Sequence, residues 1–119
     1  MARARLTAVV VLITASSADE ATRIGRALVE ERLAACANLI PSIASTYWWK
    51  GKIEESGEAL LVIKTRQDLI ERLTARVKAL HSYTVPEVIA LPILVGNPDY
   101  LNWIEESTRS SRSTKSRKS

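Results

Sequence analysis

The chain has 119 residues, of which 46% are hydrophobic, so it is long enough for one domain with a modest core. No apolar run approaches the roughly 18 residues of a membrane-spanning helix, so we expect no membrane partner. Cys36 is the only cysteine, which excludes an internal disulfide and favours a reducing compartment.

The formal net charge of +4 is unevenly distributed along the chain. Residues 107–119 consist of five Arg or Lys and eight Ser or Thr, whereas the rest of the chain holds 12 basic and 13 acidic residues. Because a segment without apolar residues has nothing to bury, we predict a single domain over 1–106 and a disordered basic, serine-rich tail over 107–119. The tail is either a solvated terminus or an electrostatic contact with nucleic acid or another anionic surface.

The N-terminal stretch MARARLTAVVVLITASSA permits two interpretations. Its arginines, short apolar stretch and small residues resemble a signal peptide with cleavage near Ala18. The β-branched run at residues 9–11 favours instead a buried strand over about residues 6–14, without which the next helix would lose its sheet partner. We therefore predict a strand here and a cytoplasmic protein.

A helix is predicted to begin at Ser17, because Ser17 and Glu20 have the spacing of a capping box. Asn38 and Pro41 mark its expected exit. Its buried face is predicted from apolar residues at helical spacing: Ala21, Ile24, Leu28 and Ala35.

The next segment, SIASTYWWKGKIEESGEALLVIKT, has the pattern of a β-hairpin. Two β-rich runs flank the polar EESGE, which predicts a turn containing Gly57 and a second arm over residues 58–65. Gly51 lies inside the first arm and suggests a bulge.

Thr65 and Asp68 resemble a capping box and predict the start of a second helix. The stretch YTVPEVIALPILVG then reads as an irregular strand, because Pro86 and Pro92 interrupt it. In NPDYLNWIEES, Asn97 as N-cap predicts a short third helix. The apolar stripe of the second helix comprises Leu69, Leu73, Val77 and Leu80.

This β-α-β-β-α-β order, followed by a short helix, predicts an α+β ferredoxin-like fold, with two helices on one face of a four-stranded antiparallel sheet. A sheet covered on one face should alternate apolar and polar residues, but runs such as AVVVLI and ALLVI are apolar on both sides. The third helix is too short to cover the second face, so we expect an oligomer whose sheets pack together, with the tryptophan-bearing hairpin reaching a neighbour.

The motifs ERLAACANLIP, YWWKGKIEE, LLVIKT, LHSYTVPEVIALP and GNPDYLNWI resemble, in this order, the CutA family of divalent-cation tolerance proteins. The resemblance covers about residues 8–106. It implies the ferredoxin-like fold, a homotrimer built through sheet edges and the long hairpin, and a role in the response to divalent metals such as copper. In the copper-binding bacterial pattern a cysteine stands at the position of Ile13 and a histidine at that of Leu80, so His81 alone of those three ligand positions is retained.

The sole histidine, His81, is a suitable ligand for Cu²⁺ or another divalent cation, but a tight site needs three or four ligands. The resemblance suggests Cys36 and Glu87 as its partners, which the fold or a neighbouring subunit would have to bring together. The alternatives are that His81 ends a helix by hydrogen bonding its last carbonyls, and that Cys36 is a small core residue.

Two further groups of residues are candidates for contacts. Tyr83 and Glu87 could form an acid/base pair that lines a cleft, with Lys64 and Lys50 as counter-charges for a small anionic ligand. Tyr47, Trp48 and Trp49 are more typical of an interface and are predicted to lie between subunits of the trimer.

We therefore predict a non-enzymatic homotrimer that binds divalent metal and needs no organic cofactor. The alternative is a regulatory trimer like the PII signalling proteins, which binds a metabolite between subunits. The sequence lacks phosphate-binding and paired-cysteine zinc motifs, and its AVVVLI and ALLVI strands lack the aromatic residues that stack RNA bases, so enzymes and nucleic-acid binding outside the tail are disfavoured.

Overall fold

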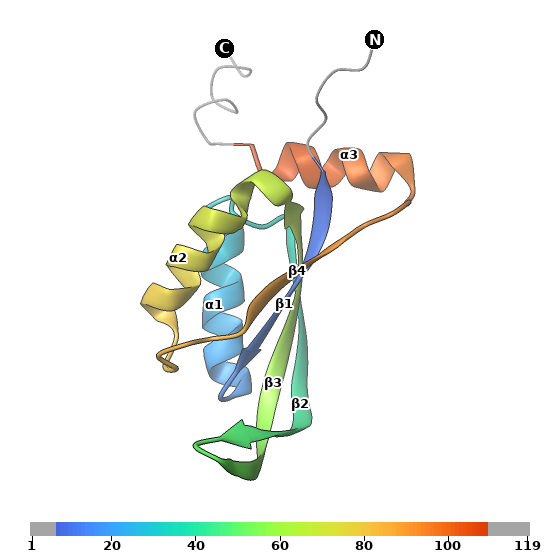
Figure 1. Ribbon diagram of the computed structural model, residues 1–119. Helices are drawn as coiled ribbons and strands as arrows, with labels where there is room; N and C mark the ends of the chain where they lie inside the picture. The colour runs from blue at the N-terminus through green and yellow to red at the C-terminus, as the bar shows by residue number, and fades with distance from the viewer. Residues whose placement is uncertain (1–6, 110–119) are drawn as a thin grey trace.

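The computed structural model describes residues 7–109, which form an antiparallel sheet of four strands with helices packed on it (Figure 1). The strand order is β2-β3-β1-β4, which is the ferredoxin-like arrangement that the order of elements predicts. The elements are β1 (Ala8–Ala15), α1 (Ala18–Glu30), β2 (Cys36–Trp49), β3 (Lys52–Arg66), a 3₁₀ turn (Gln67–Leu69), α2 (Ile70–Leu80), β4 (Val88–Pro92) and α3 (Pro98–Ser107).

The central strand β1 supplies much of the core. Every second residue of β1 is buried, and α1 and α2 lie side by side on that face of the sheet (Figure 1). Because β1 pairs with both β3 and β4, cleavage near Ala18 would remove the middle of the sheet. The predicted strand is confirmed. The largest fully buried side chains include Val11, Ile13, Ile24, Leu28, Leu61, Ile63, Leu73 and Val77.

The helix α1 packs closely on the sheet through Gly25. A Cβ atom at this position would lie 3.1 Å from the Cβ of Ala37 and 3.3 Å from a methyl carbon of Leu61. The absence of a side chain at Gly25 therefore allows the helix to approach β2 and β3 closely.

The opposite face of the sheet is apolar and has no helix over most of its area. Cross-strand partners share a face, so the register places Leu12 between Val62 of β3 and Ile89 of β4. Ile89 is 49% exposed. We call this surface the helix-free face and define it by Val10, Leu12, Ile40, Leu60, Val62, Ile89 and Leu91.

The hairpin turn differs from the predicted one. It is formed by Lys50 and Gly51, whose φ angles of 51° and 80° are those of a tight two-residue turn, and Trp49 pairs directly with Lys52. Gly57 lies inside β3 opposite Ala44, so the turn predicted at EESGE and the bulge predicted at Gly51 are both wrong. The hairpin projects beyond the helices in Figure 1 and makes the molecule elongated, with extents of 54 × 30 × 21 Å.

Helix α1 ends earlier than predicted. The chain leaves the helix after Glu30, Arg32 adopts a left-handed conformation with φ 63°, and the Leu33 N–H donates to the Leu28 carbonyl. This is a Schellman ending with arginine at the position that glycine usually occupies. The residues predicted to mark the helix exit, Asn38 and Pro41, belong to β2 instead.

Two smaller features of these strands also depart from the prediction. β2 gains an extra residue relative to β3 between Ile40 and Ile43, so Pro41 lies in a bulge, where its missing N–H is tolerated. Thr65 does not cap α2. It is buried in β3, and its hydroxyl donates to the Leu33 carbonyl at 2.7 Å.

The third helix follows the prediction at both ends, because it begins after Asn97 and ends at Ser107, the last residue of the predicted segment. The Asn97 side chain accepts from the Asp99 N–H at 2.9 Å, and Pro98 is the first helical residue. After the helix Thr108 is buried, and residues 110–119 of the predicted tail lie outside the described range. None of the helices within residues 7–109 combines the length and the apolar character needed to cross a bilayer.

Candidate functional site

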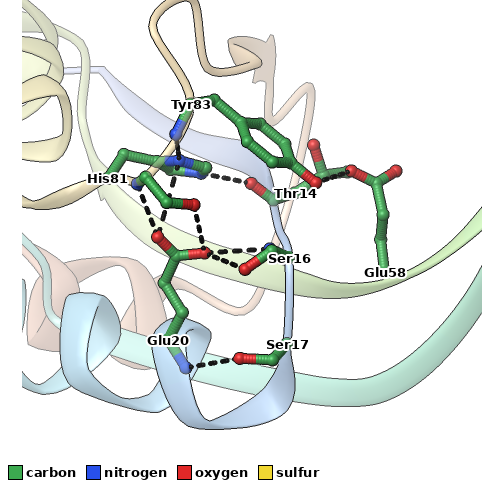
Figure 2. A network of polar contacts seen from close by, with 8 residues as sticks. Thr14, Ser16, Ser17, Glu20, Glu58, His81 and Tyr83 are labelled. Atoms are coloured by element: carbon green, nitrogen blue, oxygen red, sulfur yellow. Dashed lines mark hydrogen bonds and ion pairs between the residues drawn. The ribbon is translucent and has the colours of Figure 1, made fainter.

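A network of polar side chains lies where β1 ends and α1 begins (Figure 2). The capping box expected there is only half formed: the Ser17 hydroxyl accepts from the Glu20 N–H at 3.1 Å. The Glu20 carboxylate turns to Ser16 instead of Ser17, and its Oε1 accepts from the Ser16 N–H at 2.9 Å and from the Ser16 hydroxyl at 2.6 Å. Glu20 thus caps the end of β1 while remaining in the first turn of α1.

The same carboxylate reaches a segment 62 residues further along the chain. Oε2 accepts from the Ser82 N–H at 2.6 Å, and Oε1 accepts from the Ser82 hydroxyl at 3.1 Å. Burial by itself would raise the pKa of Glu20, but the hydrogen bonds from Ser16 and Ser82 outweigh it and lower the pKa to about 2. Glu20 is therefore a buried anion, 4% exposed, with four donors around it.

His81 lies beside this anion, at the C-terminal end of α2, and its side chain is fully buried. Its Nε2 is 2.7 Å from the Thr14 carbonyl, and its Nδ1 is 3.0 Å from the Tyr83 N–H. A carbonyl can only accept and a backbone N–H can only donate, so Nε2 carries the proton and Nδ1 accepts. Glu20 Oε2 lies 3.8 Å from Nδ1, too far for a hydrogen bond.

This geometry does not fit the role of His81 as a preformed metal ligand. Donation from Nε2–H to a carbonyl is common for ligating histidines, but the other nitrogen must then offer its lone pair to the metal. Here the Nδ1 lone pair already accepts a hydrogen bond from the Tyr83 N–H, and the His81 side chain is fully buried from solvent. A metal at Nδ1 would have to displace that N–H and leave it without a partner.

Tyr83 extends the network to the helix-free side of the sheet. Its hydroxyl donates to Glu58 Oε2 at 2.7 Å, and its ring lies 4.6 Å from the His81 ring, centre to centre. Burial and the hydrogen bond to Glu58 both raise the pKa of Tyr83. We call this set the Glu20–His81 network and define it by Thr14, Ser16, Glu20, Glu58, His81, Ser82 and Tyr83 (Figure 2).

The other predicted metal ligands lie elsewhere in the chain. Cys36 is the first residue of β2, not part of the first helix as expected, and it pairs with Lys64. Lys64 in turn pairs with Val10, so Cys36 is offset by about 13 Å along the sheet from Thr14, the residue that His81 contacts. Within residues 7–109 no three His, Cys, Asp or Glu side chains are grouped closely enough to hold a metal ion. Glu87 is exposed.

The residues of the predicted anion cleft are also spread over the chain. Lys64 contacts the Asn38 side chain, to which the Cys36 thiol also donates at 3.5 Å. Lys50 lies at the hairpin tip, 5.6 Å from the centre of the Trp49 ring, and Tyr83 belongs to the Glu20–His81 network. One chain does not bring these three residues together.

The predicted interface residues are exposed in the single chain. Trp48 is 72% exposed, Trp49 58% and Tyr47 42%, and Ile53 opposite Trp48 is 62% exposed. Such an apolar hairpin tip is unusual for a surface in contact with water and is typical of one that binds another protein.

Sequence reasoning missed the central residue of the network. The capping-box spacing singles out Glu20, but as a local cap. Nothing in the sequence near Glu20 indicates Ser82, because the contact spans 62 residues and depends on how α2 packs beside α1.

The fold defines an α+β protein of the ferredoxin-like class. The polar groups of its Glu20–His81 network find their hydrogen-bond partners within the chain. Residues 9–107 match the family described as CutA1 divalent ion tolerance protein. The chain belongs to this family.

Several relatives agree with this assignment. The chloroplastic protein CutA 1 of Oryza sativa subsp. japonica is 50% identical over 103 residues, which cover 87% of this chain and 58% of the relative. The divalent-cation tolerance protein CutA of Thermus thermophilus is 54% identical over 99 residues, which cover 83% of this chain and 96% of the relative. The chain thus spans little more than half of the rice protein and nearly all of the bacterial one.

Solved structures give the same result. The crystal structure of CutA1 from Oryza sativa matches with a TM-score of 0.85 at 48% identity, and the match covers 87% of this chain and 95% of the rice chain. The CutA1 structure from Thermus thermophilus has a TM-score of 0.84 at 52% identity, with coverages of 86% and 99%.

Proposed function

We propose that the protein is a homotrimer that takes part in the response to divalent metal ions, with copper as the first cation to test. The observation that carries the assembly is the helix-free face, on which apolar residues of all four strands are half-buried or exposed within the single chain. Each large side chain buried there by a neighbour would contribute roughly 1.5–3 kcal/mol. Trp48 and Trp49 at the hairpin tip are also exposed, and a neighbouring subunit would bury them as well.

A role with divalent cations is supported by family membership and by the names of relatives such as the Thermus protein. These names refer to cations and not to metabolites, which favours this proposal over a PII-like regulator with a cleft at Tyr83, Lys64 and Lys50. A cation site in this protein would be assembled between subunits. Half-buried Cys36 and exposed Glu87 are the predicted ligands that a neighbouring chain could reach.

We further propose that the protein binds ligands without catalysing a reaction, and that it works in the cytoplasm. In the Glu20–His81 network the acceptor nitrogen of the imidazole already binds the Tyr83 N–H, and the donors around Glu20 hold its pKa at about 2, so neither group is suited to take a proton from a substrate. The names of relatives include a chloroplastic protein and a periplasmic one, so the compartment is best tested by fractionating cells that express the full chain.

The experiment that tests the proposal combines a mass measurement with a copper titration. Light scattering should give a mass of about 40 kDa, three times the 13.2 kDa of one chain. Calorimetry with Cu²⁺ should show stoichiometric binding to the wild type, and the double variant Cys36→Ser, Glu87→Gln should bind at least about tenfold more weakly. A monomer would contradict the assembly, and absent or unchanged copper binding would contradict the metal part alone.

A further inference from the structure

The position that the family resemblance offers as a metal ligand is occupied by a histidine whose ring nitrogens are both engaged. We infer that His81 is a positioning residue and not a ligand: with Glu20 it fixes the turn at residues 81–84 against the end of β1 and thereby places Tyr83 on Glu58. The inference deepens the proposed function, because it concerns which residues a cation can use.

The first part of the argument is the direction of the hydrogen bonds around the ring. The Thr14 carbonyl fixes Nε2 as the donor, and the Tyr83 N–H fixes Nδ1 as the acceptor, so each bond determines the role of the other nitrogen. The ring therefore links β1 directly to the turn that follows α2. A metal at Nδ1 would break the bond to the Tyr83 N–H and so release the turn from the ring.

The second part is the carboxylate that lies next to the ring. Glu20 uses both oxygens, and its donors come from Ser16 on one side and Ser82 on the other. Buried carboxylates are stable only when such donors surround them, and bonds to a charged acceptor are stronger than neutral ones. Glu20 thus holds the backbone of residue 82 in place from α1, as His81 holds that of residue 83 from the end of α2.

The third part is what the fixed turn presents. Tyr83 packs against the His81 ring, with the two rings tilted by 46° and their centres 4.6 Å apart, and its hydroxyl donates to Glu58 on β3 (Figure 2). The turn is therefore held by β1, α1 and β3 together. It leads directly into the segment that carries exposed Glu87 and into the edge strand β4.

Three substitutions of His81 separate positioning from ligation. In His81→Asn the amide oxygen can take the place of Nδ1 and accept from Tyr83, whereas in His81→Gln the amide nitrogen can take the place of Nε2 and donate to Thr14. His81→Ala removes both bonds. Amides are poor copper ligands, so all three variants remove a ligand if His81 is one. Thr84→Ala, an exposed change in the same turn, is the control.

The measurements are calorimetric titration with Cu²⁺ and amide hydrogen exchange of Ser82 and Tyr83, made on the full chain in its native assembly. If His81 positions the turn, the Tyr83 amide should exchange at least about tenfold faster in His81→Ala and His81→Gln, but close to the wild-type rate in His81→Asn. Copper affinity should stay within about twofold of wild type in His81→Asn. The control should match the wild type in both.

Two results would overturn the inference. One is a loss of copper affinity of tenfold or more in His81→Asn while the Tyr83 amide stays protected, which would identify His81 as a ligand. The other is unchanged Tyr83 exchange in His81→Ala. If the wild type itself binds no copper, the metal part of the proposed function fails, and hydrogen exchange alone still decides whether His81 positions the turn.

Discussion

The Glu20–His81 network and the helix-free face lie on the same central strand and have opposite characters. At Thr14 and Ser16, the end of β1 meets polar groups that satisfy one another inside the chain. In the middle of β1, half-buried Leu12 faces away from the helices, between half-buried Val62 and exposed Ile89. The polar groups of the first region are satisfied within one chain, whereas the second region leaves apolar side chains half-buried or exposed.

This difference indicates where each kind of function belongs. Groups that are buried and paired within a chain contribute to stability and positioning, while groups left exposed at an apolar surface are available to partners. In this protein His81 belongs to the buried and paired groups, and the predicted interface residues Trp48 and Trp49 belong to the exposed ones. The comparison predicts that substitutions in the two regions will alter different measurements.

The largest effect is expected from a charge on the helix-free face. Leu12→Glu would bury a carboxylate between subunits with no partner, at a cost of several kcal/mol, while the single chain keeps its helix-side core. We expect the variant to be a folded monomer by light scattering and circular dichroism. The control is Ala75→Glu, which adds the same charge at an exposed position of α2 and should leave the assembly intact. A trimeric Leu12→Glu protein would mean that this face is not between subunits.

An effect of about 3 kcal/mol is expected from Glu20→Gln, this time on folding and not on association. The pKa of Glu20 is about 2 in the folded chain against 4.5 normally, and a shift of that size corresponds to about 3 kcal/mol. Because the folded pKa is the lower one, this stability is fully present above about pH 4.5 and is lost as the pH falls towards 2.

Chemical denaturation at several pH values checks this prediction. Glu20→Gln should lower the free energy of unfolding at pH 7 and should also flatten its decline between pH 4.5 and 2. Glu30→Gln is the matched control on the same helix, because Glu30 forms a surface pair with Arg26 and should change stability by less than about 0.5 kcal/mol. Equal acid sensitivity of the Glu20→Gln variant and the wild type would show that Glu20 does not carry this pH dependence.

The regions also differ in how far the sequence predicts them. The strand order follows from the order of the elements along the chain. The core follows from hydrophobic runs and spacing, so Val11, Leu73 and Val77 are buried as their patterns indicate. The network does not follow, because Glu20 and Ser82 meet only through the packing of α1 beside α2. The sequence does not indicate the early end of α1, because the residue in the left-handed conformation there is Arg32 and not the glycine that usually marks a helix end.

The position of the hairpin turn was also not predicted correctly from the sequence, and substitutions there are expected to change stability least. The sequence holds two glycines that could form its turn, and the polar residues around Gly57 make that position look the more suitable. The turn is at Gly51 instead, because it aligns Trp48 with Ile53 and keeps apolar residues paired across the strands. Gly51 has a φ of 80°, a conformation that side chains rarely adopt, whereas a side chain at Gly57 would meet open space.

Gly51→Ala should therefore destabilise the protein by about 1 kcal/mol, and Gly57→Ala should leave it unchanged or slightly more stable, since alanine restricts the unfolded chain. Thermal denaturation of the two variants side by side measures the difference. The reverse order would place the turn at Gly57, shift the register of β2 on β3, and move the tryptophans away from the tip. The exposed apolar surface at the hairpin tip thus depends on the choice between these two glycines.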